Sequence, residues 1–444
     1  MSSIRLTPPK KIDAKISTQA PDQAHPSLVH ILLQELEAQH QTSKNTHHPS
    51  TPSLINTLLD DARQQRATDI HLDPHAQGTM IRFRIDGQVI NCATITQTQY
   101  EKLANQIKTT ANLDPVKTFI PQEARRTYSI NGQPFDMRIT TTPCISGEKI
   151  AIRLLDPNNV NHDIHDLGLQ GQELQKVTDW LQNMNGMFLV AGPTGSGKTT
   201  TLYSLLHQIK DRSKNIMTIE DPVEYQIDGI NQIPVDQKHG LDLAMGLRTI
   251  LRLDPDYLML GEIRDKNSAK AASHASTSGH VLLSTIHSKD TVGTITSLRN
   301  LDMQNHEISS AISIIVTQRL IRKLCPHCKS QKTISKSDKR WLTAIGEKNI
   351  TQTYHPVGCP KCSNLGFTGR SGIFSIWQLS TQDLEMINRD APESEIRQAL
   401  ADQGHTTLLD AGLQKVRQGI TTLNDIRSNC QVNDKLTPQH KKTA

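Results

Sequence analysis

The sequence predicts an α/β protein whose main domain has a buried, mostly parallel sheet, preceded by a small α+β domain. Two observations lead to this prediction. After about residue 167, short apolar runs alternate with amphipathic helical segments, which is typical of a parallel sheet with crossover helices. Between residues 52 and 156, alternating apolar and polar segments are separated by hairpin-turn dipeptides.

Length, charge and hydropathy exclude several classes of protein. The 444 residues are enough for about three domains. Lys and Arg total 49 against 44 Asp and Glu, and this small excess gives no reason to expect a nucleic-acid partner. No run approaches about 18 consecutive apolar residues, so the chain is not a multi-span membrane protein. Residues 1–15 lack the apolar core of a signal peptide, and we expect a cytoplasmic location.

The N-terminal third combines a polar arm with the small α+β domain. Residues 1–51 are expected to be flexible except for one short helix at 27–38, which either packs on its own protein or docks on a partner. A helix is expected from Leu54 to Arg66, followed by strands that include 81–85 and 135–140. The dipeptides Asp86-Gly87 and Asn131-Gly132 predict hairpin turns.

The rest of the chain is expected to hold the parallel sheet and then helices. Short apolar runs predict strands at 187–191, 216–219, 257–260 and 281–285, and a capping sequence at 421–425 begins the last helix. The predicted divisions are an arm 1–51, an α+β domain 52–156, a linker 157–166, an α/β core 167–320, a cysteine-rich region 321–375, a helical region 376–430 and a polar tail 431–444.

A phosphate-binding loop stands between a predicted strand and a predicted helix. Residues 192–199 match G-x-x-x-x-G-K-[ST] in full, and this context supports the match. Glycines let backbone N–H groups turn toward a polyphosphate, Lys198 supplies charge to its outer phosphates, and the Thr199 hydroxyl coordinates Mg²⁺. The residues expected to bind ATP here are Gly192, Pro193, Thr194, Gly195, Ser196, Gly197, Lys198, Thr199 and Thr200.

A second strand carries the candidate for activating water. Residues 258–262 resemble a second nucleotide-binding strand, which normally ends in Asp followed by Glu. Gly261 stands where the Asp is usual, so the metal would depend on Thr199, phosphate oxygens, water and other carboxylates. Glu262 remains as the residue that would orient or deprotonate the attacking water.

Four cysteines form two C-x2-C pairs separated by about 30 residues. Four thiolates suit a closed tetrahedral Zn²⁺ site, which would be structural because no coordination position is left open. An iron–sulfur cluster and unliganded core cysteines are the alternatives. The predicted ligands are Cys325, Cys328, Cys359 and Cys362.

Further segments resemble a known family. Residues 218–225, 253–265, 277–287 and 318–320, in this order after the phosphate-binding loop, resemble the Asp box, Walker B and His box of the ATPases of type II secretion and type IV pilus assembly. Residues 67–71 are similar to a signature of the family's second N-terminal domain, and the resemblance runs from about 54 to about 428. It implies a RecA-like motor domain preceded by a PAS-like domain.

The resemblance also implies residue roles. The Asp box corresponds to Glu220, Asp221 and Glu224, the Walker B segment includes Arg264, and the His box corresponds to His280 and His287, all near the nucleotide. The N-terminal domain of the family donates arginines to the nucleotide when it closes on the motor domain. The matching positions are Arg138 and Arg153 as catalytic candidates and Arg125 as a weaker one. Separately, Arg370, beyond the cysteines, resembles a position where a family arginine faces the nucleotide site.

The function implied is a hexameric motor that hydrolyses Mg-ATP to assemble pilins or pseudopilins. Its expected partners are copies of itself and a polytopic inner-membrane platform protein, through which it associates with the cytoplasmic face of the membrane. The zinc region favours assembly over retraction. Two alternatives remain: a non-hydrolysing, nucleotide-gated scaffold, which Gly261 and Lys289 favour, and a DNA-translocating motor, which the 3% aromatic content disfavours.

Overall fold

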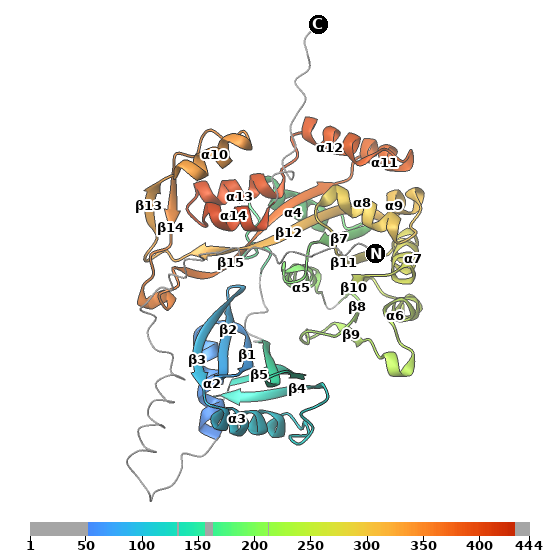
Figure 1. Cartoon of the computed structure of the whole chain (residues 1–444). Helices are drawn as coiled ribbons and strands as arrows, with labels where there is room; N and C mark the ends of the chain where they lie inside the picture. Colours follow the sequence, from blue (N-terminus) through green and yellow to red (C-terminus); the bar gives the residue numbers. More distant parts are fainter. Residues whose placement is uncertain (1–51, 131–132, 156–162, 212, 431–444) are drawn as a thin grey trace, which may run out of the picture.

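The computed structural model describes residues 52–430 except 131–132, 156–162 and 212. Figure 1 shows a small N-terminal domain beneath a larger domain, whose C-terminal helices lie at the far end. The predicted arm and polar tail, the 131–132 turn and most of the predicted linker fall outside the described residues. None of the described helices is long and apolar enough to cross a membrane.

The N-terminal domain is a six-stranded antiparallel sheet with two helices packed on one face, which confirms the predicted α+β class. Alternate residues of the second strand, Ile81, Phe83 and Ile85, are buried beneath the helices, as their spacing predicts. The strand order is β3-β2-β1-β6-β5-β4. The elements are α2 (Pro52–Gln64), β1 (Ala67–His75), β2 (Gly78–Ile85), β3 (Gln88–Ile95), α3 (Gln97–Thr110), β4 (Gln122–Ile130), β5 (Gln133–Cys144) and β6 (Gly147–Leu155).

The larger domain is built on a seven-stranded sheet in the order β15-β12-β7-β11-β10-β8-β9. Neighbouring strands run parallel except for β15, which pairs antiparallel with β12 at one edge. The strands are β7 (Met187–Ala191), β8 (Ile216–Glu220), β9 (Asn231–Pro234), β10 (Tyr257–Ile263), β11 (Val281–Ile286), β12 (Ile312–Leu324) and β15 (Phe367–Gln378). The mostly parallel sheet predicted from the sequence is confirmed.

Helices cover both faces of this sheet, which explains why its strands are almost continuously apolar. In β7, Met187 and Leu189 enter one hydrophobic core, whereas Phe188 and Val190 enter the other. Helices α4 (Gly171–Gln182) and α5 (Lys198–Ile209) pack on the second face. The first face carries α6 (Leu243–Ile250), α7 (Lys266–Thr277), α8 (Thr291–Asn300) and α9 (Asn305–Ala311).

The cysteine-rich region is not a separate domain. It is an excursion of the chain, residues 325–366, between the paired strands β12 and β15. The predicted divisions at 320 and 375 fall inside β12 and β15, and these two strands pair along most of their length. Residues 373–377 are buried in the cores of the sheet, so this apolar run continues the strand before the helical region begins. The excursion contains β13 (Ser330–Thr333), α10 (Lys336–Ala344) and β14 (Gln352–His355).

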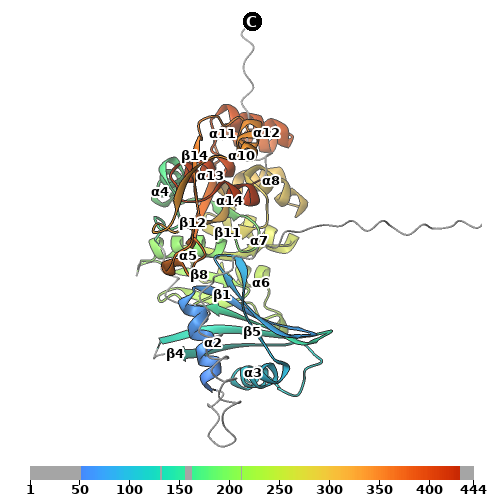
Figure 2. The ribbon, with the colours of Figure 1, turned by 60° about the vertical axis from the view of Figure 1, so that its left-hand side comes forward.

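Four helices follow β15, and Figure 2 shows them above the sheet. Thr422 caps the last of them, with its hydroxyl accepting a hydrogen bond from the Asp425 N–H, as the capping sequence predicts. The Asp425 carboxylate also pairs with Arg322 of β12, which ties this helix to the sheet. The helices are α11 (Thr381–Asn388), α12 (Glu393–Asp402), α13 (Leu408–Arg417) and α14 (Leu423–Asn429).

Two polar contacts join the N-terminal domain to the larger domain. The Arg125 guanidinium of β4 donates hydrogen bonds to the carbonyls of Val223, at 2.8 Å, and Glu224, at 2.9 Å. In the turn after β2, Asp86 accepts a 3.0 Å hydrogen bond from the Gly369 N–H. Two separate elements of the larger domain therefore hold the N-terminal domain in this arrangement.

Replacing Arg125 by Ala should loosen the segment that carries Val223 and Glu224. Loss of hydrogen bonds worth about 1 kcal/mol should speed amide exchange there by about fivefold, as measured by hydrogen–deuterium exchange mass spectrometry. Arg126→Ala is the matched control, because the adjacent side chain lies on the opposite face of β4. Equal exchange in the two variants would contradict a joining role for Arg125.

His405 should make stability depend on pH. It lies between α12 and α13, its Nε2 is 2.9 Å from the Ser375 hydroxyl, and burial, with a smaller contribution from Lys176, lowers its pKa to about 4. The unfolded chain therefore binds the proton more readily, and stability is lost as the pH falls from about 6.5 toward 4. Between pH 7 and pH 5, His405→Gln should lose about 2 kcal/mol less unfolding free energy than the parent. Urea unfolding at both pH values measures this difference, and equal losses would refute it.

Candidate functional site

The phosphate-binding loop joins β7 to α5, and crowding excludes a side chain at two of its glycines, Gly192 and Gly197. A Cβ on Gly192 would lie 2.5 Å from the Ser196 hydroxyl and 2.8 Å from the Gln318 carbonyl oxygen. Gly197 has a φ of 88° and precedes the first residue of α5. These positions admit only glycine, and the loop opens at a helix N-terminus, where backbone N–H groups and the helix dipole favour an anion.

The side chain of Lys198 lies back over the phosphate-binding loop. Its Nζ donates to the carbonyls of Gly192, at 3.0 Å, and Pro193, at 3.1 Å. Burial holds the pKa of Lys198 below its usual range, while the charge of Glu262 opposes this and that of Arg319 adds to it. The ammonium group therefore lies within the electrostatic reach of Glu262 without a carboxylate bonded to it.

Charged side chains from three parallel strands gather at the same edge of the sheet. Arg264 Nη1 lies 2.8 Å from Asp221 and 3.4 Å from Glu262, and His287 Nε2 lies 3.7 Å from the other Glu262 oxygen. Desolvation opposes the charge of Arg264, but Asp221 outweighs it and raises the Arg264 pKa. The structure therefore brings together Asp221, Glu262, Arg264 and His287, which follow or end β8, β10 and β11.

Packing does not demand the glycine that stands before Glu262. A Cβ on Gly261 would lie 3.4 Å from the nearest atoms, which belong to Ile219 and Glu220, and this is ordinary van der Waals contact. The backbone of Gly261 is also that of an extended strand, and its carbonyl accepts a 2.8 Å hydrogen bond from Thr285. The missing carboxylate is therefore a feature of the site's chemistry rather than of the fold.

Glu220 is enclosed in a hydrogen-bonded network beneath α5. Its carboxylate accepts hydrogen bonds from Tyr203, from Thr218 at 2.7 Å and from Gln232 at 3.1 Å. Burial raises the Glu220 pKa, and the nearby charge of Glu224 acts in the same direction. Glu220 thus links the helix that begins at Lys198 to β8, and Tyr203 is a member of the network that the sequence motifs do not identify.

The arginines proposed to reach the nucleotide have other partners here. Arg138 pairs with Glu123 at 2.5 Å and Arg153 with Asp69 at 3.1 Å, all within the N-terminal domain. Arg125 contacts carbonyls of the larger domain, as described above. Arg370 is exposed on β15.

Within the described part of the chain, the predicted residues Glu224 and His280 make no hydrogen bond or ion pair to the charged side chains at the sheet edge, whereas the unpredicted Arg319 contacts a neighbouring loop. Glu224 approaches the N-terminal domain through its carbonyl, and the buried His280 Nδ1 has no hydrogen-bond partner among the described residues. Arg319, to which the motifs assign no role, donates a 2.8 Å hydrogen bond to the carbonyl of Lys289, two residues after His287. Its position within the matched segment 318–320 is the signal in the sequence that points to it.

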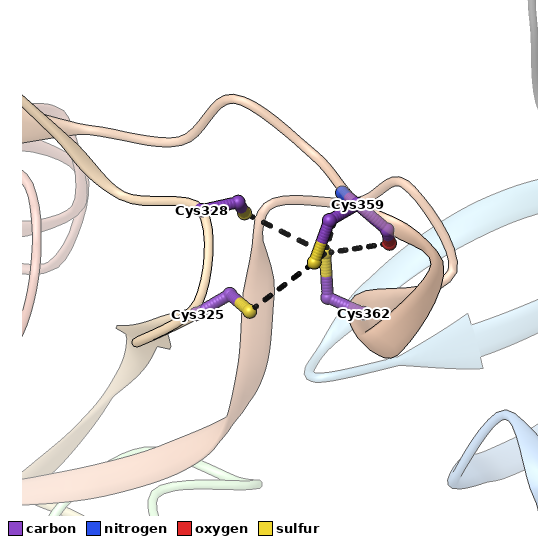
Figure 3. Close-up of side chains that lie close together, drawn as sticks. All are labelled: Cys325, Cys328, Cys359 and Cys362. Carbon is purple, nitrogen blue, oxygen red and sulfur yellow. Dashed lines mark hydrogen bonds between the residues drawn. The ribbon is translucent and has the colours of Figure 1, made fainter.

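The four predicted cysteines converge on one point, as Figure 3 shows. Three of the sulfur–sulfur separations are 3.7–3.8 Å, and all sulfurs lie within 4.8 Å of one another. A Zn–S length of about 2.3 Å in a tetrahedron places sulfurs about 3.8 Å apart. Backbone N–H groups of Gly358 and Gly366 donate to Cys328 and Cys362, which suits thiolates held by a cation. The donor set and its spacing therefore fit Zn²⁺.

Comparison with solved structures shows a shared fold. The ATPase DotB of Legionella pneumophila matches with a TM-score of 0.64 at 17% identity, over 87% of this chain and 97% of that one. The pilus retraction motor PilT, solved with bound ADP, matches with a TM-score of 0.58 at 22% identity, over 85% and 96%. The α/β architecture with its preceding small domain is that of secretion and pilus ATPases.

Sequence comparison shows the family. Residues 44–428 match the model of the type II/IV secretion system protein family. Type II secretion system ATPase E of Vibrio cholerae is 38% identical over 373 residues, which cover 84% of this chain and 74% of that protein. Type IV pilus assembly ATPase PilB of Myxococcus xanthus is 35% identical over 406 residues, which cover 90% and 71%. The chain therefore belongs to the type II/IV secretion system protein family and is an ATPase.

Proposed function

We propose that this chain is a motor that hydrolyses Mg-ATP to assemble pilins or pseudopilins in a type IV pilus or type II secretion machine. One observation carries the hydrolytic part: the phosphate-binding loop follows β7 and Glu262 stands near the end of β10, so the two lie at the same edge of the parallel sheet. The names of the two relatives support the biological setting.

In this proposal the loop and α5 bind the triphosphate. The loop N–H groups surround the phosphates, and Lys198 exchanges the carbonyls of Gly192 and Pro193 for the β- and γ-phosphate oxygens. Thr199 would hold Mg²⁺, which lowers the charge on the phosphates. All nine loop residues from Gly192 to Thr200 are proposed as nucleotide contacts.

Glu262 is proposed to orient and deprotonate the attacking water. Gly261 provides no carboxylate for the metal. Asp221 is proposed to supply one instead, since Arg264 joins it to Glu262 through two ion pairs. His280 and His287 are proposed to sense the state of the nucleotide, and the 3.7 Å approach of His287 to Glu262 supports this for His287. Arg264 is proposed as a further nucleotide contact. Glu220 and Glu224, in the same segment as Asp221, are proposed to line the nucleotide and metal site.

Closure of the N-terminal domain is proposed to complete the site. Arg138 and Arg153 would leave Glu123 and Asp69 to neutralise charge on the phosphates in the transition state. The Arg138–Glu123 pair is exposed, so its exchange for phosphate is energetically modest. Asp69 is largely buried, but it would keep Arg84 as an ion-pair partner when Arg153 leaves. Arg125 is a weaker candidate for the same role, and Arg370 of β15 is a weak candidate for a nucleotide contact from the larger domain.

The setting proposed for the motor is the cytoplasmic face of the inner membrane. Copies of the chain would form a ring, most simply a hexamer, bound to a polytopic platform protein of the machine. Four free cysteines arranged as a metal site suit a reducing compartment. We further propose that Cys325, Cys328, Cys359 and Cys362 hold a structural Zn²⁺ that fixes the excursion between β12 and β15.

Substitution of the two central residues should separate binding from hydrolysis. Lys198→Ala should abolish ATP binding because the phosphates lose their counter-charge, whereas Glu262→Gln should retain binding and lower hydrolysis by about 10²–10⁴-fold. Phosphate release from oligomeric, zinc-loaded protein and binding of a labelled ATP measure the two effects.

Glu385→Gln is the control, because this residue is exposed on α11 and far in sequence from the site. Parental hydrolysis by Glu262→Gln would refute its role. Nucleotide binding without hydrolysis by the parent would favour a nucleotide-gated scaffold. Strong stimulation by single-stranded DNA at physiological salt would favour a DNA-translocating motor instead.

The zinc proposal predicts about one zinc ion per chain by elemental analysis, since one tetrahedral site takes one ion. Cys362→Ser should lose the metal and lower the melting temperature by at least about 5 °C, because metal binding contributes to folding. Cys144→Ser is the matched control, an exposed cysteine outside the cluster, and it should keep both. Zinc-free protein that melts at the same temperature would contradict the proposal.

A further inference from the structure

Gln318 of β12 lies beside the phosphate-binding loop. Strand β12 is the parallel neighbour of β7, and Thr317 is opposite Ala191, the last residue before the loop. Gln318 is therefore aligned with Gly192, and its carbonyl oxygen occupies the space that a Cβ on Gly192 would need. The side chain is 2% exposed, so its amide has to find partners inside the protein.

The side chain of Gln318 reaches the other end of the loop. Its Oε1 accepts a 2.7 Å hydrogen bond from the Thr201 hydroxyl, in the first turn of α5. Its Nε2 lies against Gly197, where an added Cβ would be 2.8 Å away. One residue thus contacts the first glycine of the loop, the last glycine and the helix that follows.

Arg319 holds the backbone of Gln318 and extends the contact to the next loop. Its guanidinium donates to the Gln318 carbonyl, at 3.0 Å, and to the Lys289 carbonyl, at 2.8 Å. Lys289 follows His287, whose ring lies 3.7 Å from Glu262. The same two residues of β12 therefore contact the segments on both sides of the proposed reaction centre.

We propose that Gln318 is a positioning residue of the ATPase. It fixes the spacing between Gly192 and the first turn of α5, and so aims the side chains of Lys198 and Thr199 at the phosphates. The amide is suited to this task because Oε1 accepts from Thr201 while the Nε2 donor faces the anion-binding loop. The inference rests on the proposed nucleotide site and adds a residue that does not itself react.

Two substitutions of Gln318 should have different effects. Gln318→Met keeps the volume but loses the bond to Thr201, so kcat should fall about tenfold or more while KM changes less than about threefold, since small misplacements mainly affect the transition state. Gln318→Glu keeps an acceptor for Thr201 but adds charge beside Gly197. The dissociation constant for ATP should therefore rise at least about tenfold.

Thr201→Val tests the partner, and Thr317→Val is the matched control. Thr201→Val should lower kcat to a similar extent, and the double variant with Gln318→Met should be no slower than the slower single variant. Thr317 neighbours Gln318 on β12, is buried, and has a hydroxyl with no hydrogen-bond partner within the described part of the chain. Its replacement by Val should leave kcat unchanged.

Steady-state hydrolysis, ATP binding and the melting temperature, measured for every variant, test the positioning role of Gln318. Parental kcat in Gln318→Met and Thr201→Val, together with an inactive Lys198→Ala, would overturn the role of Gln318 and leave the proposed function standing. Additive losses in the double variant would also overturn it. Failure of the parent to hydrolyse ATP would overturn both proposals.

Discussion

The candidate site depends on one geometric constraint, the common direction of neighbouring strands. In a parallel sheet every strand ends at the same edge, and the residues that follow the strands meet there. Ala191 of β7 is paired with Ile286 of β11, and Ile263 of β10 is paired with the same Ile286. The phosphate-binding loop, Glu262 and His287 are thereby brought together although long stretches of chain separate them. Reversal of any one strand would remove its residues from the site.

Strand β12 extends this constraint toward the cysteine cluster. It begins beside β7, presents Gln318 and Arg319 to the loops of the site, pairs Arg322 with Asp425, and ends at Leu324, next to Cys325. A strand is stiff along its length and advances about 3.3 Å per residue, so the two ends cannot move independently. The excursion in turn contacts the N-terminal domain through Leu365, which packs on its core, and Gly369 at the start of β15 donates to Asp86.

The sequence was sufficient for features with short-range signals. The alternation at Ile81–Ile85, the apolar runs of the central strands, the loop at 192–199 and the cap at Thr422 each carry their own pattern, and the structure has them where they were expected. The two C-x2-C pairs likewise predicted that the four cysteines would lie together. What the sequence did not reveal were partnerships set by tertiary contact. The enclosure of Glu220 by Tyr203, the contact of Gln318 with Thr201 and the return of β15 to the sheet join residues with no common motif.

The pairing of β12 with β15 has a consequence for how the cysteine-rich region relates to the rest of the chain. Leu324 and Phe367 are partners in the ladder, so the residues between them leave the sheet and return at the same point. Topologically the region is an enlarged hairpin connection, and the entropy of closing such a connection rises only slowly with its length. A much shorter turn could join the two strands without altering the register of any other strand. The sheet therefore does not fix the size of the region, whereas α13 and α14 do constrain it, because Leu342 and Ile345 of the region share their hydrophobic core.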